Sequence, residues 1–150
     1  MEQAIEMAIQ NVRFQHGGPF GALVVRNGEM IGSGVNSVTG TNDPTAHAEI
    51  VAIRAACQNI RSFQLTGCEL YTSCEPCPMC LGAIYWARPE RFYFACTRQD
   101  ATASGFDDAL IYEELHFEPE RRAIPGLGIM REQGLSAFDE WNESGNKVPY

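Results

Sequence analysis

Three of the six cysteines stand within seven residues, at Cys74, Cys77 and Cys80. A disulfide framework would spread its cysteines through a shorter, loop-rich chain, so this crowding favours metal or redox chemistry in a reducing compartment. Cys77 and Cys80 are three residues apart at the expected start of a helix, where they share one face and the helix N-terminus favours thiolates. His47 precedes Cys77 by 30 residues. We expect a fold that brings the two segments together.

The segment His47-Ala48-Glu49 and the segment 76–80 form an H-x-E … P-C-x-x-C pattern, which is the signature of zinc-dependent nucleobase deaminases. Two thiolates and one imidazole make a three-ligand zinc site whose fourth position is open for water. Glu49 would carry protons instead of binding the metal. Because residues two apart on an ideal helix face nearly opposite ways, His47 and Glu49 can converge only through side-chain length or a distorted first turn.

Two plainer interpretations of these residues stay open. A closed site of His47, Cys74, Cys77 and Cys80 would be a purely structural, non-enzymatic zinc module, and it would leave Glu49 without a role. A thioredoxin-type redox pair of Cys77 and Cys80 would leave the His47 segment unexplained. Glu49 is therefore the residue that discriminates an enzyme from a structural module.

Expected helices alternate with short apolar strands along the chain. Asn27-Gly28 is a strong hairpin signal between two apolar runs. Asp43 is a plausible N-cap, and Pro44 fits the first position of a helix. We expect helices over residues 2–15, 43–57, 78–87, 111–115 and 137–142, strands over 22–26, 30–35, 69–72, 91–96 and 128–131, and a polar loop over 37–42.

This order of elements predicts an α/β protein, a three-layer α/β/α sandwich around a mixed central sheet. The strand over residues 91–96 is expected to be buried on both faces. A length of 150 residues suits one domain, and no linker divides residues 1–150.

The charge of the chain bears on its partners. The net charge is −8 and Lys147 is the one lysine. This charge opposes binding to nucleic acid, because a protein surface that binds phosphates needs many lysine and arginine side chains. The longest uncharged apolar run, Leu81 to Ala87, is far too short to span a membrane. Glu2 and Glu6 stand where a secretory signal would be basic, so we expect a cytoplasmic protein.

Four further motifs extend the resemblance beyond the zinc pattern: G-G-P-F-G-A over 17–22, N-D-P-T-A-H-A-E over 42–49, the run from L-Y-T-S-C to A-R-P over 70–89, and G-F-D-D over 105–108. With them the chain resembles the cytidine deaminase superfamily, and within it the short bacterial zinc-dependent guanine deaminases. The resemblance covers nearly the whole chain, including the terminal aromatic Tyr150. It implies the cytidine deaminase-like fold and one Zn²⁺ per chain.

The resemblance implies roles for particular residues. His47, Cys77 and Cys80 would hold zinc, and Glu49 would be the proton shuttle. Asp108 would bind the ring edge of the base and help to move a second proton, with Asp107 as the alternative. The residues implied in binding the base are Phe20, Asn36, Ala48, Trp86 and Tyr150.

The resemblance also implies an assembly and a reaction. Tyr150 would close the pocket of a partner subunit, through a C-terminal segment (about 119–150) exchanged in a homodimer. The implied reaction converts guanine, a small purine base, to xanthine and ammonia. The alternatives are deamination of the tRNA wobble adenosine, of guanosine or of cytosine, and the sequence does not separate guanine from guanosine or amino-triazines.

Overall fold

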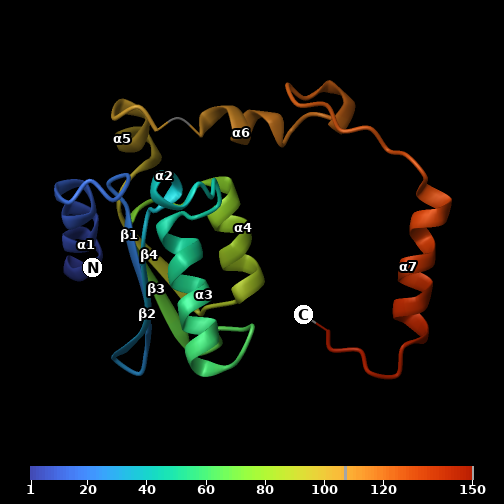
Figure 1. Cartoon of the computed structure of the whole chain (residues 1–150), viewed down its shortest axis with the longest axis horizontal. Coiled ribbons are helices and arrows are strands. Elements are labelled where there is room, and N and C mark those ends of the chain that lie inside the picture. The colour runs from blue at the N-terminus through green and yellow to red at the C-terminus, as the bar shows by residue number, and fades with distance from the viewer. Residues whose placement is uncertain (107, 150) are drawn as a thin grey trace. The chain divides into compact units, whose positions relative to one another are not determined.

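The computed structural model describes residues 1–106 and 108–149. Contacts within the chain divide it into two compact units, Met1–Ala109 and Leu110–Tyr150 (Figure 1). A single domain over residues 1–150, with an exchanged C-terminal segment, stays a prediction.

The first unit is built on a four-stranded mixed sheet of order β2-β1-β3-β4. Strand β1 pairs antiparallel with β2 and with β3, whereas β3 and β4 are parallel. Asn27 and Gly28 turn the β1–β2 hairpin at φ 53° and 82°, the left-handed conformations that such a turn requires. The strands are β1 (Gly21–Arg26), β2 (Glu29–Val35), β3 (Cys68–Cys74) and β4 (Arg91–Cys96).

Helices cover both faces of this sheet (Figure 1). Helix α1 (Glu2–Arg13) lies on one face, and α3 (Ala48–Ile60) and α4 (Pro78–Ala87) lie on the other. The main core cluster fills the space between the sheet and α3 and α4, where alanines of α3 let the helix approach β1 and β2 closely. The predicted three-layer α/β/α sandwich is confirmed.

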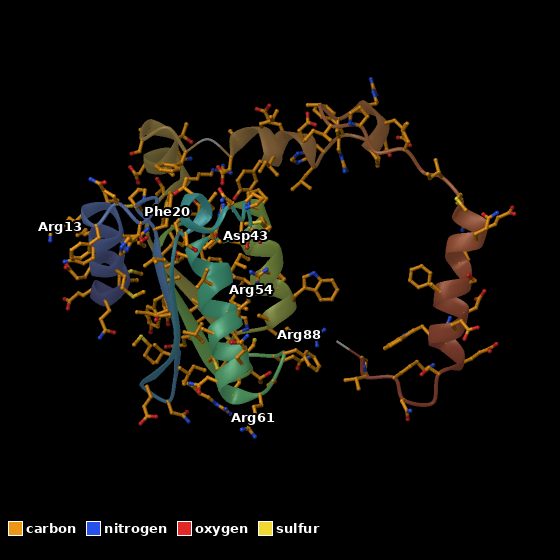
Figure 2. The ribbon with its side chains drawn as sticks, in the orientation of Figure 1. Arg13, Phe20, Asp43, Arg54, Arg61 and Arg88 are labelled. Carbon is orange, nitrogen blue, oxygen red and sulfur yellow. The ribbon has the colours of Figure 1, made fainter. Side chains whose placement is uncertain are left out.

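The start of α3 differs from the prediction. The helix begins at Ala48 with His47 as its N-cap, so Asp43 is not the cap. The Asp43 carboxylate instead accepts hydrogen bonds from the backbone N–H (2.8 Å) and the hydroxyl (2.7 Å) of Thr45, and it lies 3.8 Å from Arg54 (Figure 2). This local turn satisfies the carboxylate before the helix begins. The predicted loop over 37–42 contains a short helix, α2 (Val38–Thr41).

Strand β4 is not buried on both faces, as the sequence predicted. It is the edge strand of the sheet, and Tyr93 and Phe94 are exposed. The apolar stripe of α1 is also displaced from the core, because Ala4, Ala8 and Asn11 are buried while Ile5, Ile9 and Val12 are exposed. Apolar side chains of α1 and β4 thus stand at the surface of this unit.

The remaining helices are short, apart from the last. The first unit also contains α5 (Arg98–Ala103), which starts with a capping box between Thr97 and Asp100. Helix α6 (Ala109–Glu114) follows, and the second unit holds the 3₁₀ turn η1 (Pro119–Arg121) and α7 (Arg131–Glu143). The predicted strand over 128–131 is wrong: these residues form no strand, and Met130 adopts φ 53° just before α7. No described helix is long and apolar enough to cross a membrane.

Candidate active site

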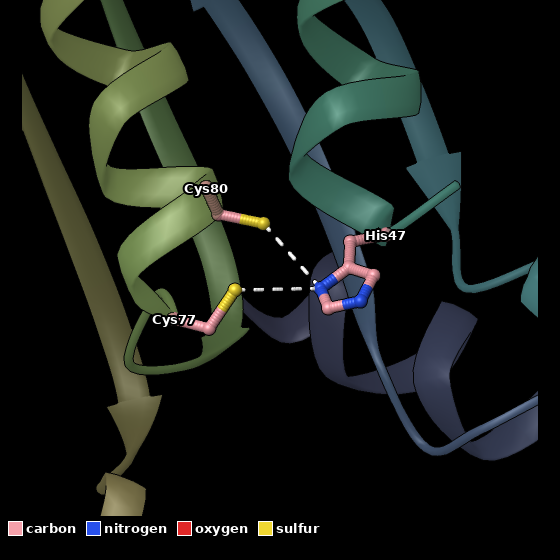
Figure 3. Close-up of side chains that lie close together, drawn as sticks. All are labelled: His47, Cys77 and Cys80. Carbon is pink, nitrogen blue, oxygen red and sulfur yellow. Dashed lines mark hydrogen bonds between the residues drawn. The ribbon is translucent and has the colours of Figure 1, made fainter. Parts of the chain in front are cut away.

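The two ends of helices α3 and α4 bring the predicted metal ligands together. His47 is the N-cap of α3 and Cys77 is the N-cap of α4, both with extended backbone, and Pro78 starts α4. His47 Nδ1 lies 3.5 Å from Cys77 Sγ and 3.6 Å from Cys80 Sγ (Figure 3). His47 has extended backbone at the N-cap position, whereas Glu49 lies within the helix. The two side chains are therefore not forced to opposite faces of one helix, which explains how they converge.

These three side chains fit a zinc ion. Their ligand atoms all lie within 4.8 Å of one another. Bond lengths of about 2.05 Å to nitrogen and about 2.3 Å to sulfur, at a tetrahedral angle, place the two ligand atoms about 3.6 Å apart. The nitrogen–sulfur distances of 3.5 and 3.6 Å match this value. One imidazole and two thiols would leave a fourth position for water.

Cys74 does not belong to this group of ligand atoms among the described residues. Its thiol donates to the backbone oxygen of Thr97 at 3.4 Å, at the end of β3. Burial raises the pKa of the Cys74 thiol to about 11, so it stays protonated. The geometry therefore favours the open three-ligand site over the closed four-ligand one.

The metal-binding side chains share protons in the absence of metal. A hydrogen bond from Cys80, and a second one from His47, lower the pKa of Cys77 to about 4. The pKa of Cys80 is raised, first by its hydrogen bond to Cys77, because the two thiols hold one proton between them. The hydrogen bond to Cys77 in turn raises the pKa of His47. Zinc binding would release the protons that these groups hold.

Glu49 lies beside the ligands, and its side chain is buried, with 6% of its surface exposed. The Thr72 hydroxyl donates to Glu49 Oε1 at 3.1 Å, and the Cys80 thiol donates to Oε2 at 3.5 Å. Burial raises the pKa of the Glu49 carboxyl. A carboxyl with a raised pKa beside a water position can both accept and return a proton near neutral pH.

The structure brings three of the other predicted residues to the same end of the fold. The pKa of His47 is raised mainly by its hydrogen bond to Cys77, and the charge of Asp108 makes the smallest contribution, so Asp108 lies within electrostatic reach of His47. Asn36 follows β2, and its backbone N–H donates to the Phe20 carbonyl at 3.1 Å. The Phe20 ring packs edge-on against Phe106, with 4.9 Å between the ring centroids. Figure 2 shows Phe20 near the start of β1.

Other predicted residues lie elsewhere or outside the described residues. Ala48 is fully buried within the core, so only its backbone could face a ligand. Trp86 is 63% exposed and stands six residues beyond Cys80, about 9 Å further along α4. Asp107 and Tyr150 lie outside the described residues.

Three residues at the site carried no prediction from the sequence. Phe106 was within the G-F-D-D motif, but only the structure shows its contact with Phe20. Thr72 holds Glu49 and lies on the predicted strand. Asn11 is buried below the Gly17–Gly18 segment, and its helical spacing from Ala4 and Ala8 was the signal that could have found it.

Comparison with known proteins gives one family and several relatives. The family described as the cytidine and deoxycytidylate deaminase zinc-binding region matches residues 1–96. Over 150 residues the chain is 49% identical to the guanine deaminase of Bacillus subtilis (strain 168), and the match covers 100% of this chain and 96% of that protein. An X-ray structure of guanine deaminase from Bacillus subtilis, also 49% identical, matches with a TM-score of 0.97 over 99% of this chain and 95% of that chain.

Two further relatives are less similar to this chain. A guanine deaminase from Nitrosomonas europaea is 30% identical, with a TM-score of 0.68 over 95% of this chain and 82% of that chain. A tRNA-specific adenosine deaminase of Buchnera aphidicola subsp. Schizaphis graminum (strain Sg) is 43% identical over 88 residues, which are 59% of this chain and 58% of that protein. The similarity to this tRNA enzyme thus covers little more than half of either chain, whereas the similarity to the guanine deaminase of Bacillus subtilis covers the whole of this chain.

Proposed function

We propose that this chain, which belongs to the cytidine and deoxycytidylate deaminase zinc-binding family, hydrolyses guanine to xanthine and ammonia. The observation that carries the proposal is the full-length similarity to a guanine deaminase, combined with the open His47–Cys77–Cys80 site beside Glu49. The partial match to tRNA deaminases makes the wobble adenosine the second candidate. The net charge of −8 supports the small base over tRNA, because a tRNA-binding surface needs basic side chains to contact phosphates.

Glu49 is the proton carrier of the proposed mechanism. Zinc, when bound by the three ligands, supplies the Lewis-acid chemistry that makes water nucleophilic at neutral pH. Glu49 accepts a proton from the water as its oxygen bonds to C2 of guanine, and it delivers this proton to the ring nitrogen next to C2. The hydroxyl proton of the tetrahedral carbon then passes, through Glu49 or Asp108, to the amine. The bond between C2 and the exocyclic amine nitrogen breaks, and ammonia and xanthine leave.

The remaining site residues position the base in this proposal. Asn36 hydrogen-bonds the purine, Phe20 packs against its ring, and the backbone at Ala48 faces its edge. Asp108, which lies within electrostatic reach of His47, binds the ring edge of the base. Trp86 packs against the base with Phe20, and Tyr150 of a second copy closes the pocket.

We propose further that the C-terminal segment of a second copy completes the site in a homodimer. An apolar hollow of about 430 Å³ lies between α1 and the end of β4, and Ile5, Ile9 and Val12 line it. Helix α7 has no buried residue and carries apolar side chains at intervals of three residues, Leu135, Phe138 and Trp141. These two surfaces suit each other in chemistry, and a reciprocal exchange closes with two-fold symmetry.

The proposed setting is the cytoplasm. All six cysteines are free, and two of them are needed as thiolates for the metal. A reducing compartment keeps such thiols available, whereas an oxidising one would favour their loss to disulfides.

A substrate panel tests the proposed reaction. The zinc-loaded protein is incubated separately with guanine, guanosine, adenine, cytosine and tRNA, and released ammonia is measured. We expect release from guanine in large excess over the other substrates. Efficient deamination of tRNA or cytosine, with guanine left intact, would show that the substrate is misassigned.

A further inference from the structure

Asn11 is a polar side chain on the buried side of α1, with 3% of its surface exposed. Its Nδ2 donates two hydrogen bonds, each of 2.8 Å, to the backbone oxygens of Gly18 and Asn36. These acceptors belong to two segments far apart in sequence, the loop before β1 and the residue after β2. Asn11 therefore ties together the two segments that carry Phe20 and Asn36.

A separate contact, made by Gly18, orients the Asn36 side chain. The backbone N–H of Gly18 points to Asn36 Oδ1 at 3.4 Å. Because a backbone N–H can only donate, the amide oxygen of Asn36 must face it, and the NH₂ group must face the other way. The described residues use Oδ1 and the backbone of Asn36 in hydrogen bonds, which leaves Nδ2 available to a ligand.

The close approach of the two segments depends on Gly17. A Cβ at this position would lie 2.1 Å from the Asn36 oxygen and 3.2 Å from Asn11 Nδ2. Any larger residue would thus displace the backbone of Asn36. Gly17 and Asn11 act on the same contact from two sides.

One polar atom of Asn11 is left without a hydrogen bond. Its Oδ1 is buried and has no hydrogen-bond partner among the described residues. An unpaired buried oxygen costs free energy, and an apolar side chain would avoid that cost. The two bonds from Nδ2 account for an amide at this position.

From these contacts we propose that Asn11 is a positioning residue that presents Asn36 as a donor to the O6–N7 edge of the purine. Guanine offers two acceptors along this edge. 2,6-Diaminopurine carries the same amine at C2 but has a donor NH₂ group at C6, which faces the Asn36 NH₂ group unfavourably. The inference rests on the proposed function, because it assumes that a purine occupies the site.

The test compares guanine with 2,6-diaminopurine as substrates of the zinc-loaded protein. Asn11→Ala should lower kcat/KM for guanine about tenfold, the effect of one neutral hydrogen bond, mainly through KM. The value for 2,6-diaminopurine should change little, so the preference for guanine falls by the same factor. The affinity for xanthine, which keeps O6 and N7 and is not turned over, should fall in parallel in an equilibrium titration.

Two further variants separate positioning from folding. Gly17→Ala should reduce the same preference, because the added Cβ would displace the backbone of Asn36 without removing the Asn11 side chain. Asn59→Ala is the matched control, because Asn59 is an exposed asparagine whose side chain also donates to a backbone oxygen, that of Ile31 at 3.1 Å. It should leave the preference unchanged.

The outcomes distinguish the inference from the proposed function. If the unmodified protein does not act on guanine, the proposed function is overturned and this inference with it. If guanine is deaminated but is not preferred to 2,6-diaminopurine, or if the preference is unchanged in Asn11→Ala and Gly17→Ala, the inference alone is overturned. Loss of the preference in both variants, with Asn59→Ala unaffected, supports it.

Discussion

The two units of the chain differ in what they bury. Every buried apolar residue of the core lies in Met1–Ala109, whereas the described helical residues of Leu110–Tyr150 include none that is buried. The first unit holds His47, Cys77, Cys80 and Glu49 through two helix N-termini packed on a sheet. The apolar side chains of the described helical residues in the second unit are all at least partly exposed. The contrast teaches that the candidate metal ligands lie in the unit that has a buried core, whereas the second unit offers apolar surface.

The largest expected effect is the loss of the metal when a ligand in the first unit is removed. Cys80→Ala should reduce the zinc content from about one ion per chain to nearly none, because a two-ligand site binds weakly. Cys74→Ala should retain the zinc, since its thiol bonds to Thr97 and not to the ligand group. Metal analysis of both purified variants measures this. Loss of zinc from the Cys74 variant would instead indicate the closed structural site.

The next effect separates catalysis from metal binding. Glu49→Ala should keep its zinc and its fold but lose turnover by about 10²- to 10⁴-fold or more, because one carboxyl serves several proton transfers. Glu132→Ala, which removes an exposed glutamate of the second unit, should leave turnover unchanged. Steady-state ammonia release measures both. A Glu49→Ala protein with a tenth or more of the original turnover is incompatible with the mechanism.

The sequence predicted the first unit better than the second, for a physical reason. The zinc pattern, the Asn27-Gly28 hairpin and the helix over 78–87 each depend on local chemistry, and the structure has the hairpin and the helix, and it brings the three ligand residues together. The burial of β4 depends on which elements cover it, which no periodicity within residues 91–96 specifies. The start of α3 was misplaced because Asp43 can either cap a helix or close a turn, and tertiary contacts decide between them.

The second unit lacked such local signals. Gly128 to Arg131 contains two adjacent apolar residues that a short strand could hold, but a strand needs a neighbour with which to pair, and the described structure gives it none. The prediction that the tail is exchanged between subunits came from the resemblance to guanine deaminases and not from the sequence pattern of the tail itself. Among site residues, Asn11 escaped notice because its partners are backbone atoms of Gly18 and Asn36, which sequence patterns do not reveal.

A truncation tests whether the second unit acts on the site of another copy. Deleting residues 146–150 should spare zinc content and folding while lowering kcat/KM by about 10²-fold, the scale of a misplaced positioning group. Mixing this protein with Glu49→Ala, under conditions that exchange subunits, should restore partial activity. The mixed dimer has one pocket with an intact Glu49 and an intact tail from its partner.

The mixing experiment needs proof that subunits exchange, for which a mass-tagged chain and native mass spectrometry suffice. Confirmed exchange without any recovery of activity would falsify the proposal that the tail acts across the interface. A truncated protein with unchanged kcat/KM would remove the tail from the pocket altogether.

The smallest expected effect comes from the same substitution placed in each unit. At Gly34 on β2, a Cβ would lie 2.4 Å from the Ala48 oxygen and 2.6 Å from the Ala52 nitrogen, so Gly34→Ala must push α3 away from the sheet. We expect a loss of about 1–3 kcal/mol in the free energy of unfolding, the usual cost of overpacking. At Gly134 in α7, a Cβ meets nothing within 4 Å, and alanine favours the helix by ~0.5–1 kcal/mol. Denaturant unfolding of the two variants measures the difference.

Two outcomes would contradict these expectations. A destabilised Gly134→Ala protein would show that a second chain already packs against that side of α7. An unaffected Gly34→Ala protein would contradict the tight contact between β2 and α3 that holds His47 and Glu49 in place.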